Sequence, residues 1–322
     1  MVRSPLRTLS STLVIELDGI AKTFDETILA LQDVSFSVAT GSVCALLGHN
    51  GAGKTTAINI LSTLMRPSYG RAFVAGYDVV QEPAKVRESI AVTGQVAAID
   101  WQLTGRENLV MFSRLHGMRR KDANARAEAL IQQFDLADAA DRGMVTYSGG
   151  MRRRIDIAAA LVVPPKVLFL DEPTTGLDPL SRRGVWDLVS SLAADGVTVL
   201  LTTQYLEEAD VLSDSIVVMD HGRVVANGTS NDLKRRIGIS YCTVSPVNPA
   251  DLPKILAAVA DFEDAQADEV ANTVSVLAPN GVATLSEVFR RVDRLDVELE
   301  DISLRKPSLD EVFLHLTGSV TP

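Results

Sequence analysis

The sequence predicts an α/β fold with a largely parallel sheet, followed by a smaller α+β domain. Short, wholly apolar runs alternate with segments of helical length through the first two thirds of the chain. A strand that helices cover on both faces is apolar at nearly every position, so these runs fit a buried parallel sheet. After Gly228 the composition changes, and a second series of strands and helices begins.

Four apolar runs mark the predicted strands of the parallel sheet. They are residues 43–47, 167–170, 197–201 and 216–219. Predicted helices occupy residues 55–65 and 182–193. Residues 103–161 are rich in Ala, Arg, Glu and Leu with helical periodicity, which predicts a helical subdomain inserted into the α/β unit. The predicted first domain is therefore residues 14–228, preceded by a short flexible extension at residues 1–13.

Residues 229–322 are predicted to form a C-terminal accessory domain. Strand, helix, two strands, helix and strand follow one another at residues 240–245, 251–262, 264–269, 273–277, 284–295 and 297–304, with 264–269 the poorest strand. This order is that of a ferredoxin-like α+β domain. A last helix is predicted from a capping box of Ser308 and Glu311. Its apolar face comprises Leu309, Val312, Phe313 and Leu316.

Composition and charge exclude several classes of protein. The 322 residues carry a net charge of −10, which argues against a nucleic-acid-binding surface, because such a surface is basic. No apolar run approaches the roughly 18 residues that a membrane-spanning helix needs. The two cysteines lack metal-site spacing and fit a reduced cytosolic interior. If the protein acts on a membrane, a partner must supply the membrane spans.

Residues 48–55 read Gly-His-Asn-Gly-Ala-Gly-Lys-Thr, between a buried-type strand and a helix, and match the phosphate-binding P-loop. Glycines let successive N–H groups face an anion, and the helix N-terminus adds positive potential. Lys54 is expected to reach the β- and γ-phosphates and assist catalysis, and the Thr55 hydroxyl to bind Mg²⁺. The side chain of His49 is interpreted as a bystander. Residues expected to contact ATP are Gly48, Asn50, Gly51, Ala52, Gly53, Lys54, Thr55 and Thr56.

A second motif, residues 167–172, is an apolar strand that ends in two carboxylates. Because side chains alternate across a strand, the two carboxylates can serve different purposes. Asp171 is predicted to hold Mg²⁺ through water. Glu172 is predicted to act as the general base for the water that attacks the γ-phosphate. The alternative is a pair of carboxylates that only solvates the end of the strand.

With these motifs in place, the chain resembles the ABC ATPase family of P-loop NTPases. Residues 147–152, Tyr-Ser-Gly-Gly-Met-Arg, resemble the family's signature loop at the start of a helix. In the family this loop contacts the γ-phosphate held by the opposite subunit, so that two chains sandwich two ATP molecules head to tail. The resemblance thus implies ATP contacts for Ser148, Gly149 and Gly150.

Three further positions match the family, and a fourth departs from it. Gln95 resembles the glutamine that senses Mg²⁺ and the membrane partner, and Asp178 resembles the loop that communicates across the dimer. Phe24 stands where the family has an aromatic side chain that stacks on adenine, the alternative being a core phenylalanine. Gln204 replaces the usual switch histidine, and it can donate a hydrogen bond to the γ-phosphate but cannot be protonated.

More narrowly, the chain resembles the ATPase subunits of daunorubicin-resistance exporters. The features are Tyr-Ser-Gly-Gly-Met-Arg-Arg-Arg, the segment 200–210 and the ending Ser-Leu-Asp-Glu-Val-Phe-Leu at residues 308–314. This resemblance implies ATP-driven export of a hydrophobic drug or lipid-like molecule through a separate ABC-2 type permease. The ATPase would then lie at the cytoplasmic face of the cell membrane.

Two other functions stay open at this point. One is an import ATPase, and the other is a soluble ABC protein that acts on ribosomes or DNA, which the acidic charge disfavours. The C-terminal domain is interpreted as a dimer-stabilising module, with a ligand sensor as the alternative. Residues 96–103, with Ile99 and Trp101, are predicted to dock on the membrane partner, unless Trp101 is buried in the helical subdomain.

Overall fold

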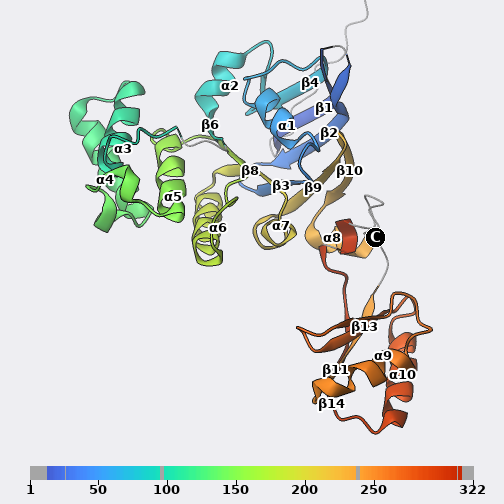
Figure 1. Ribbon diagram of the computed structural model, residues 1–322. Helices are drawn as coiled ribbons and strands as arrows, with labels where there is room; N and C mark the ends of the chain where they lie inside the picture. Colours follow the sequence, from blue (N-terminus) through green and yellow to red (C-terminus); the bar gives the residue numbers. More distant parts are fainter. Residues whose placement is uncertain (1–12, 26, 95–97, 237–239, 310, 314–322) are drawn as a thin grey trace, which may run out of the picture. The chain divides into compact units, whose positions relative to one another are not determined.

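The computed structural model describes residues 13–313 apart from 26, 95–97, 237–239 and 310 (Figure 1). The chain divides into two compact units, Met1–Ser230 and Asn231–Pro322. The division falls two residues after Gly228, where the composition changes. Of the predicted N-terminal extension, only Leu13 lies within the described residues, and there it begins the first strand.

A six-stranded sheet forms the centre of the first unit. Its order is β10 (Arg223–Gly228), β9 (Ser215–Asp220), β3 (Val43–Leu47), β8 (Thr198–Thr203), β7 (Val167–Asp171) and β6 (Ile90–Thr93). All neighbours are parallel except β10, which pairs antiparallel with β9. The strands β3, β7 and β8 are buried at every residue, as their apolar sequences predict. Their carboxyl ends meet at one edge of the sheet.

A second, antiparallel sheet of four strands was missed by the sequence analysis. Its order is β2 (Ile28–Ala39), β1 (Leu13–Phe24), β4 (Tyr69–Val74) and β5 (Tyr77–Asp78). Strand β2 alternates buried and exposed residues in its second half, and β1 mixes buried with half-buried residues, so these strands lack the continuous apolar runs on which the prediction relied.

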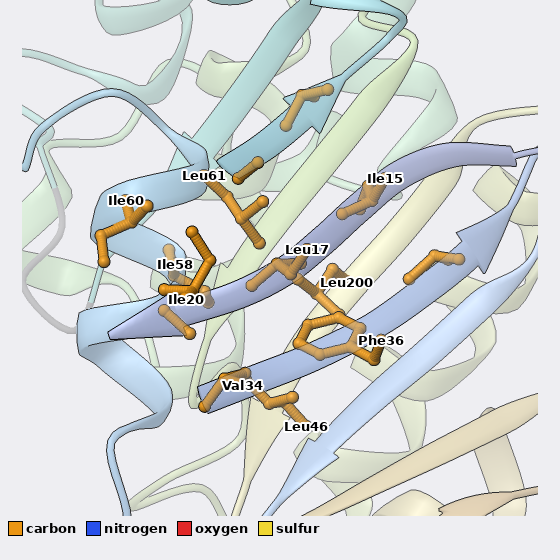
Figure 2. Close-up of a cluster of buried hydrophobic side chains, with 14 of the residues drawn as sticks. Ile15, Leu17, Ile20, Val34, Phe36, Leu46, Ile58, Ile60, Leu61 and Leu200 are labelled. Atoms are coloured by element: carbon orange, nitrogen blue, oxygen red, sulfur yellow. The ribbon is translucent and has the colours of Figure 1, made fainter. Parts of the chain in front are cut away.

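Apolar side chains from both sheets form one core. Figure 2 shows Ile15, Leu17 and Ile20 of β1 with Phe36 of β2 and other members of this cluster. The helix α1 (Lys54–Leu61) contributes Ile58, Ile60 and Leu61, and it contacts β2, β4 and β7. The helix that begins at the phosphate loop is therefore anchored to both sheets.

The helices of the first unit lie between and beside these strands. They are α1, α2 (Pro83–Ser89), α3 (Gly105–Leu115), α4 (Arg120–Gln133), α5 (Gly149–Ala160), α6 (Pro179–Ala194) and α7 (Leu206–Leu212), with short 3₁₀ turns η1 (Ala137–Ala139) and η2 (Met144–Thr146). Figure 1 shows α3, α4 and α5 grouped together as the helical subdomain. Helix α1 ends four residues before the predicted residue 65, because Thr63 takes a left-handed conformation with φ 66°.

The second unit has the predicted ferredoxin-like strand order. Its antiparallel sheet runs β12 (Gln266–Asp268), β13 (Thr273–Leu277), β11 (Tyr241–Pro246) and β14 (Leu299–Arg305). Helix α8 (Ser230–Arg236) begins at the last residue of the first unit, and the remaining elements are η3 (Pro249–Asp251), α9 (Leu252–Ala258), α10 (Val282–Val292) and η4 (Asp293–Leu295). A separate cluster around Val244, Ile255 and Val288 forms the core of this unit.

The predicted capping box near the C-terminus is formed. The Glu311 amide donates to Ser308 Oγ at 3.2 Å, and the Ser308 amide donates to Glu311 Oε2 at 2.7 Å. Leu309 and Val312 are buried, whereas Leu316 lies outside the described residues.

Both cysteine thiols are free and buried, Cys44 on β3 and Cys242 on β11. Burial raises the pKa of Cys44 to about 12 and that of Cys242 to about 11. Within the described residues, no helix is long and apolar enough to cross a membrane.

Candidate nucleotide-binding site

The loop between β3 and α1 is shaped by glycines at positions that exclude a side chain. Gly51 and Gly53 have φ of 86° and 101°, which only glycine adopts without strain. A Cβ on Gly48 would lie 2.4 Å from the Met219 carbonyl oxygen. The Gly48 amide also donates to the Thr203 carbonyl at 3.2 Å. The loop thus runs close against the ends of β8 and β9, as a phosphate-binding loop requires.

Lys54 lies at the start of α1 with its ammonium group enclosed. Its side chain is 5% exposed, and Nζ donates to the carbonyl oxygens of Gly48 at 2.7 Å and His49 at 3.1 Å. Glu172 Oε1 is 3.7 Å from Nζ. Burial lowers the pKa of the ammonium, and the charges of Glu172 and Asp171 oppose that shift. A phosphate group could take the place of the carbonyl partners and compensate the buried charge.

Asp171 converges with two hydroxyl groups at the end of β7. Thr55 Oγ1 is 3.2 Å from Asp171 Oδ1 and 3.1 Å from Oδ2, and Thr202 Oγ1 donates to Oδ1 at 2.6 Å. The carboxylate is buried. A carboxylate with adjacent hydroxyl oxygens is the donor set that Mg²⁺ prefers, so Thr55 and Asp171 fit the predicted metal site.

Glu172 follows in a left-handed conformation, with φ 48°. This conformation is strained for a residue with a β-carbon, and such residues gather at functional sites. The Glu172 amide donates to Thr202 Oγ1 at 2.9 Å, and Glu172 Oε2 accepts from Thr175 Oγ1 at 3.2 Å. The chain therefore turns sharply after Asp171 and directs the second carboxylate toward Lys54.

Thr202 was not predicted from the sequence, and its hydroxyl joins the two acidic residues. On β8 it pairs with Asp171 of β7, donates to the Asp171 carboxylate and accepts from the Glu172 amide. A polar pair, Thr202-Thr203, at the end of an otherwise apolar strand was the available signal.

Replacing Thr202 by Val is expected to reduce ATP turnover by about tenfold to 10²-fold, because both acidic groups lose their common support. Stability should fall by about 1 kcal/mol, since the half-buried Glu172 N–H loses its hydrogen-bond partner. Thr198→Val is the matched control. Thr198 is buried on the same strand, and its hydroxyl accepts from the Gly41 amide at 2.8 Å. Thermal unfolding of both variants measures the loss of stability, and steady-state kinetics measures the loss of turnover. Equal turnover losses in the two variants would show that Thr202 does not position Asp171 and Glu172.

A buried ion pair on α5 was also missed. Arg153 donates to Asp156 Oδ2 at 3.1 Å, to the Gly94 carbonyl at 3.0 Å and to the Asp171 carbonyl at 3.5 Å. Asp156 accepts in turn from the Ala98 amide at 3.2 Å. The pair thus ties α5 to both flanks of residues 95–97 and to the end of β7. Gln95 itself lies outside the described residues.

The signature-like residues form the N-terminus of α5. Ser148 caps the helix by accepting from the Met151 amide at 3.3 Å. Ser148 and Gly149 are exposed, whereas Gly150 is buried, and a Cβ on it would meet Ser181 Oγ at 2.7 Å. Gly149 and Glu172 line a common hollow of about 490 Å³. The N-terminus of α5 therefore borders the same hollow as the second carboxylate.

Three other predicted residues lie on separate elements of the first unit. Asp178 caps α6, accepting from the amides of Leu180 and Ser181 at 3.0 and 2.9 Å. Gln204 directly follows β8 and is half-buried. Phe24 is the last residue of β1, beside the start of β2, whose Ala30 carbonyl would lie 2.8 Å from a Cβ on Gly53. The hairpin that carries Phe24 therefore borders the phosphate loop, and Phe24 is half-exposed.

Trp101 and Ile99 differ in exposure. Trp101 is 45% exposed, and Arg152 lies over its ring at 4.9 Å. Trp101 is therefore not buried in the helical subdomain, which was the alternative to a docking role. Ile99 is 5% exposed, so it is a core residue and offers no docking surface.

Comparison with known proteins identifies the family. The ABC transporter family profile matches residues 31–175, and that of the DrrA1-3-like ATP-binding protein C-terminal domain matches residues 228–317. Doxorubicin resistance ATP-binding protein DrrA of Mycobacterium tuberculosis is 52% identical over 314 residues, covering 96% of this chain and 95% of the relative. The chain belongs to the ABC transporter ATP-binding proteins. Members couple ATP hydrolysis to transport, so this ATP-binding protein is an ATPase of that kind.

Other relatives and solved structures agree. Daunorubicin/doxorubicin resistance ATP-binding protein DrrA of Streptomyces peucetius is 48% identical over 314 residues, covering 95% of this chain and 93% of the relative. An ATP-binding subunit of an ABC transporter superposes with TM-score 0.62 and 30% identity, covering 70% and 93% of the two chains. A dimeric ATP-binding cassette bound to ADP and Pi has TM-score 0.60 and 25% identity, covering 67% and 98%. The predicted fold class and family resemblance are thereby confirmed for this ATP-binding protein.

Proposed function

We propose that this ATP-binding protein powers the export of a hydrophobic drug or lipid-like molecule through a separate membrane permease. The observation that carries the proposal is the likeness to doxorubicin and daunorubicin resistance ATP-binding proteins along nearly the whole chain, including the C-terminal domain. This likeness favours export over import, and the net charge of −10 disfavours action on nucleic acid. The protein would work at the cytoplasmic face of the membrane, with residues 229–322 as an accessory domain.

The arrangement of charged groups supports a mechanism for hydrolysis. The phosphate loop and Lys54 would bind the β- and γ-phosphates, while Phe24 would stack on adenine. Thr55 and Asp171 would hold Mg²⁺, with Gln95 as the third predicted contact, and the ion would neutralise phosphate charge. Glu172, 3.7 Å from the ammonium of Lys54, would accept a proton from the attacking water.

A head-to-tail dimer would complete the site. The amides at the N-terminus of α5 would face the γ-phosphate on the opposite subunit, and Asp178, which caps α6, would lie near the contact between cassettes. The dimeric arrangement of a structurally similar cassette supports this proposal. Each ATP would then be enclosed by the phosphate loop of one chain and the Ser148 loop of the other.

Gln204→Ala is expected to lower kcat by about tenfold and to change ATP affinity less, because the lost hydrogen bond is made chiefly in the transition state. Gln204→His should turn ATP over at least as fast as the unmodified chain, since histidine also places a hydrogen-bond donor at this position. Steady-state kinetics and equilibrium nucleotide binding test this together. A Gln204→Ala protein with weaker ATP binding and unchanged kcat would contradict the role.

Trp101→Ala is expected to weaken association with the membrane partner by about tenfold, because an exposed aromatic side chain anchors many interfaces. Phe289→Ala is the control, since Phe289 is 48% exposed but lies on α10 of the other unit. Both variants should bind ATP normally. Quantitative co-purification from detergent-solubilised membranes measures the effect. Equal recovery of partner with both variants would show that Trp101 does not dock.

Export itself is tested by purification and transport. The tagged chain, isolated in mild detergent, should retain an integral membrane protein of the ABC-2 permease type. Vesicles that hold this complex should move doxorubicin in an ATP-dependent manner, and vesicles with Glu172→Gln should not. Recovery of ribosomes or DNA instead of a membrane protein would overturn the proposal.

A further inference from the structure

A cluster of metal-ligating side chains lies beside the phosphate loop and has no part in the mechanism above. His49 of the loop, Asp220 at the end of β9 and His221 in the following turn place their ligand atoms within 4.8 Å of one another. His49 Nε2 is 2.9 Å from Asp220 Oδ1, which is 3.9 Å from His221 Nε2. The two imidazole rings meet edge to face, with centroids 5.1 Å apart.

The hydrogen bond of His49 Nδ1 determines whether Nε2 carries a hydrogen or a lone pair. Nδ1 lies 2.6 Å from the Asn50 carbonyl oxygen, and a nitrogen facing a carbonyl must carry the hydrogen. In a neutral imidazole, Nε2 then presents a lone pair to the Asp220 carboxylate. Two lone pairs 2.9 Å apart repel unless a cation or a proton lies between them. A histidine that donates one N–H to a backbone carbonyl and offers the other nitrogen is the usual arrangement of a metal ligand.

The backbone around the cluster is already fixed. The Gly222 amide donates to the Ala52 carbonyl at 3.0 Å, which joins the turn after β9 to the phosphate loop. The Gln32 amide donates to the Gly222 carbonyl at 2.7 Å, which joins the same turn to β2. The three ligand groups are therefore brought together by main-chain contacts that do not depend on a metal.

We propose that His49, Asp220 and His221 form a binding site for Zn²⁺ beside the nucleotide pocket. Two imidazoles and a carboxylate suit Zn²⁺, whereas Mg²⁺ prefers oxygen ligands alone. Asp220 is 19% exposed and His221 is 82% exposed, so an ion can enter from solvent. A bound Zn²⁺ would cross-link the phosphate loop to the β9–β10 turn. This site is distinct from Thr55 and Asp171, which would hold the catalytic Mg²⁺.

The test is calorimetric titration of the nucleotide-free, full-length chain with Zn²⁺ in excess Mg²⁺. We expect one Zn²⁺ per chain and a rise in Tm on binding, because the ion binds the folded state. His221→Ala should weaken Zn²⁺ binding by about tenfold or more and abolish the rise in Tm. Because His221 projects into solvent, this variant should fold normally, which circular dichroism checks. Asp220→Asn should weaken binding similarly.

His116→Ala provides the matched control. His116 is also exposed, but it follows α3 and is no part of the cluster. It should bind Zn²⁺ as the unmodified chain does.

The buried thiols of Cys44 and Cys242 are poor competitors for the ion, because burial favours their protonated form. Absence of stoichiometric Zn²⁺ binding would show that the three side chains do not hold this ion. Equal binding by His221→Ala and His116→Ala would place any Zn²⁺ elsewhere. Either result overturns the proposal.

Discussion

Glu172→Gln is expected to leave ATP bound while turnover falls by about 10² to 10⁴, the usual contribution of a general base. The amide keeps the shape of the carboxylate and can still accept from Thr175, but it lacks a basic oxygen. Lys54 loses a negative neighbour 3.7 Å away, which makes the ammonium more available to phosphate. Uncleaved ATP should then hold two cassettes together.

Light scattering in ATP and Mg²⁺ detects this dimer. The molar mass of the Glu172→Gln protein should double with ATP and return to that of one chain with ADP. Glu300→Gln is the control, because Glu300 is exposed on β14 of the other unit and undergoes the same chemical change. Normal hydrolysis by Glu172→Gln, with no ATP-dependent dimer, would mean that another group accepts the proton.

Lys54→Ala is expected to weaken ATP binding by about 10- to 100-fold, the equivalent of one charge-assisted hydrogen bond. Hydrolysis should fall below detection, since the same ammonium stabilises charge on the transferred phosphoryl group. Removal of the cation also leaves Glu172 and Asp171 without their positive neighbour, which adds electrostatic repulsion toward phosphate.

Equilibrium binding of a fluorescent ATP analogue measures the loss. Lys85→Ala is the comparison, because Lys85 is 58% exposed and contacts Glu82 and the ring of Tyr77, away from the phosphate loop. Its removal should change binding little, since surface ion pairs contribute weakly. Equal affinity of the two variants would exclude Lys54 from the phosphate site.

Apolar runs in the sequence predicted the buried strands, and the glycine-rich motif predicted the phosphate loop. Strand β3 has the predicted bounds because every residue of the run 43–47 is buried. Strand β12 was a poor candidate, and it forms as three exposed residues that pair with β13. Its existence depends on the neighbouring strand more than on its own side chains. The antiparallel sheet escaped prediction because alternating strands give weaker signals than apolar runs.

Long-range contacts explain what the sequence could not reveal about the site. Thr202 meets Asp171 only because β7 and β8 are neighbours in a particular register. Arg153 lies three residues beyond the signature-like glycines, but its partners Gly94 and Asp171 come from two different strand ends. Residues that touch phosphate directly occupy short motifs of fixed spacing. Residues that support them can come from any strand that the topology brings alongside, so a single sequence does not identify them.

The two enclosed cysteines make the protein convenient for site-specific labelling. Only a thiolate reacts readily with maleimides or spin-label reagents, and burial both blocks access to these sulfur atoms and favours their protonated form. A cysteine introduced on an exposed surface would therefore react selectively without prior removal of the native pair. Paired probes on α5 and α6 could then report the approach of two cassettes during an ATP cycle.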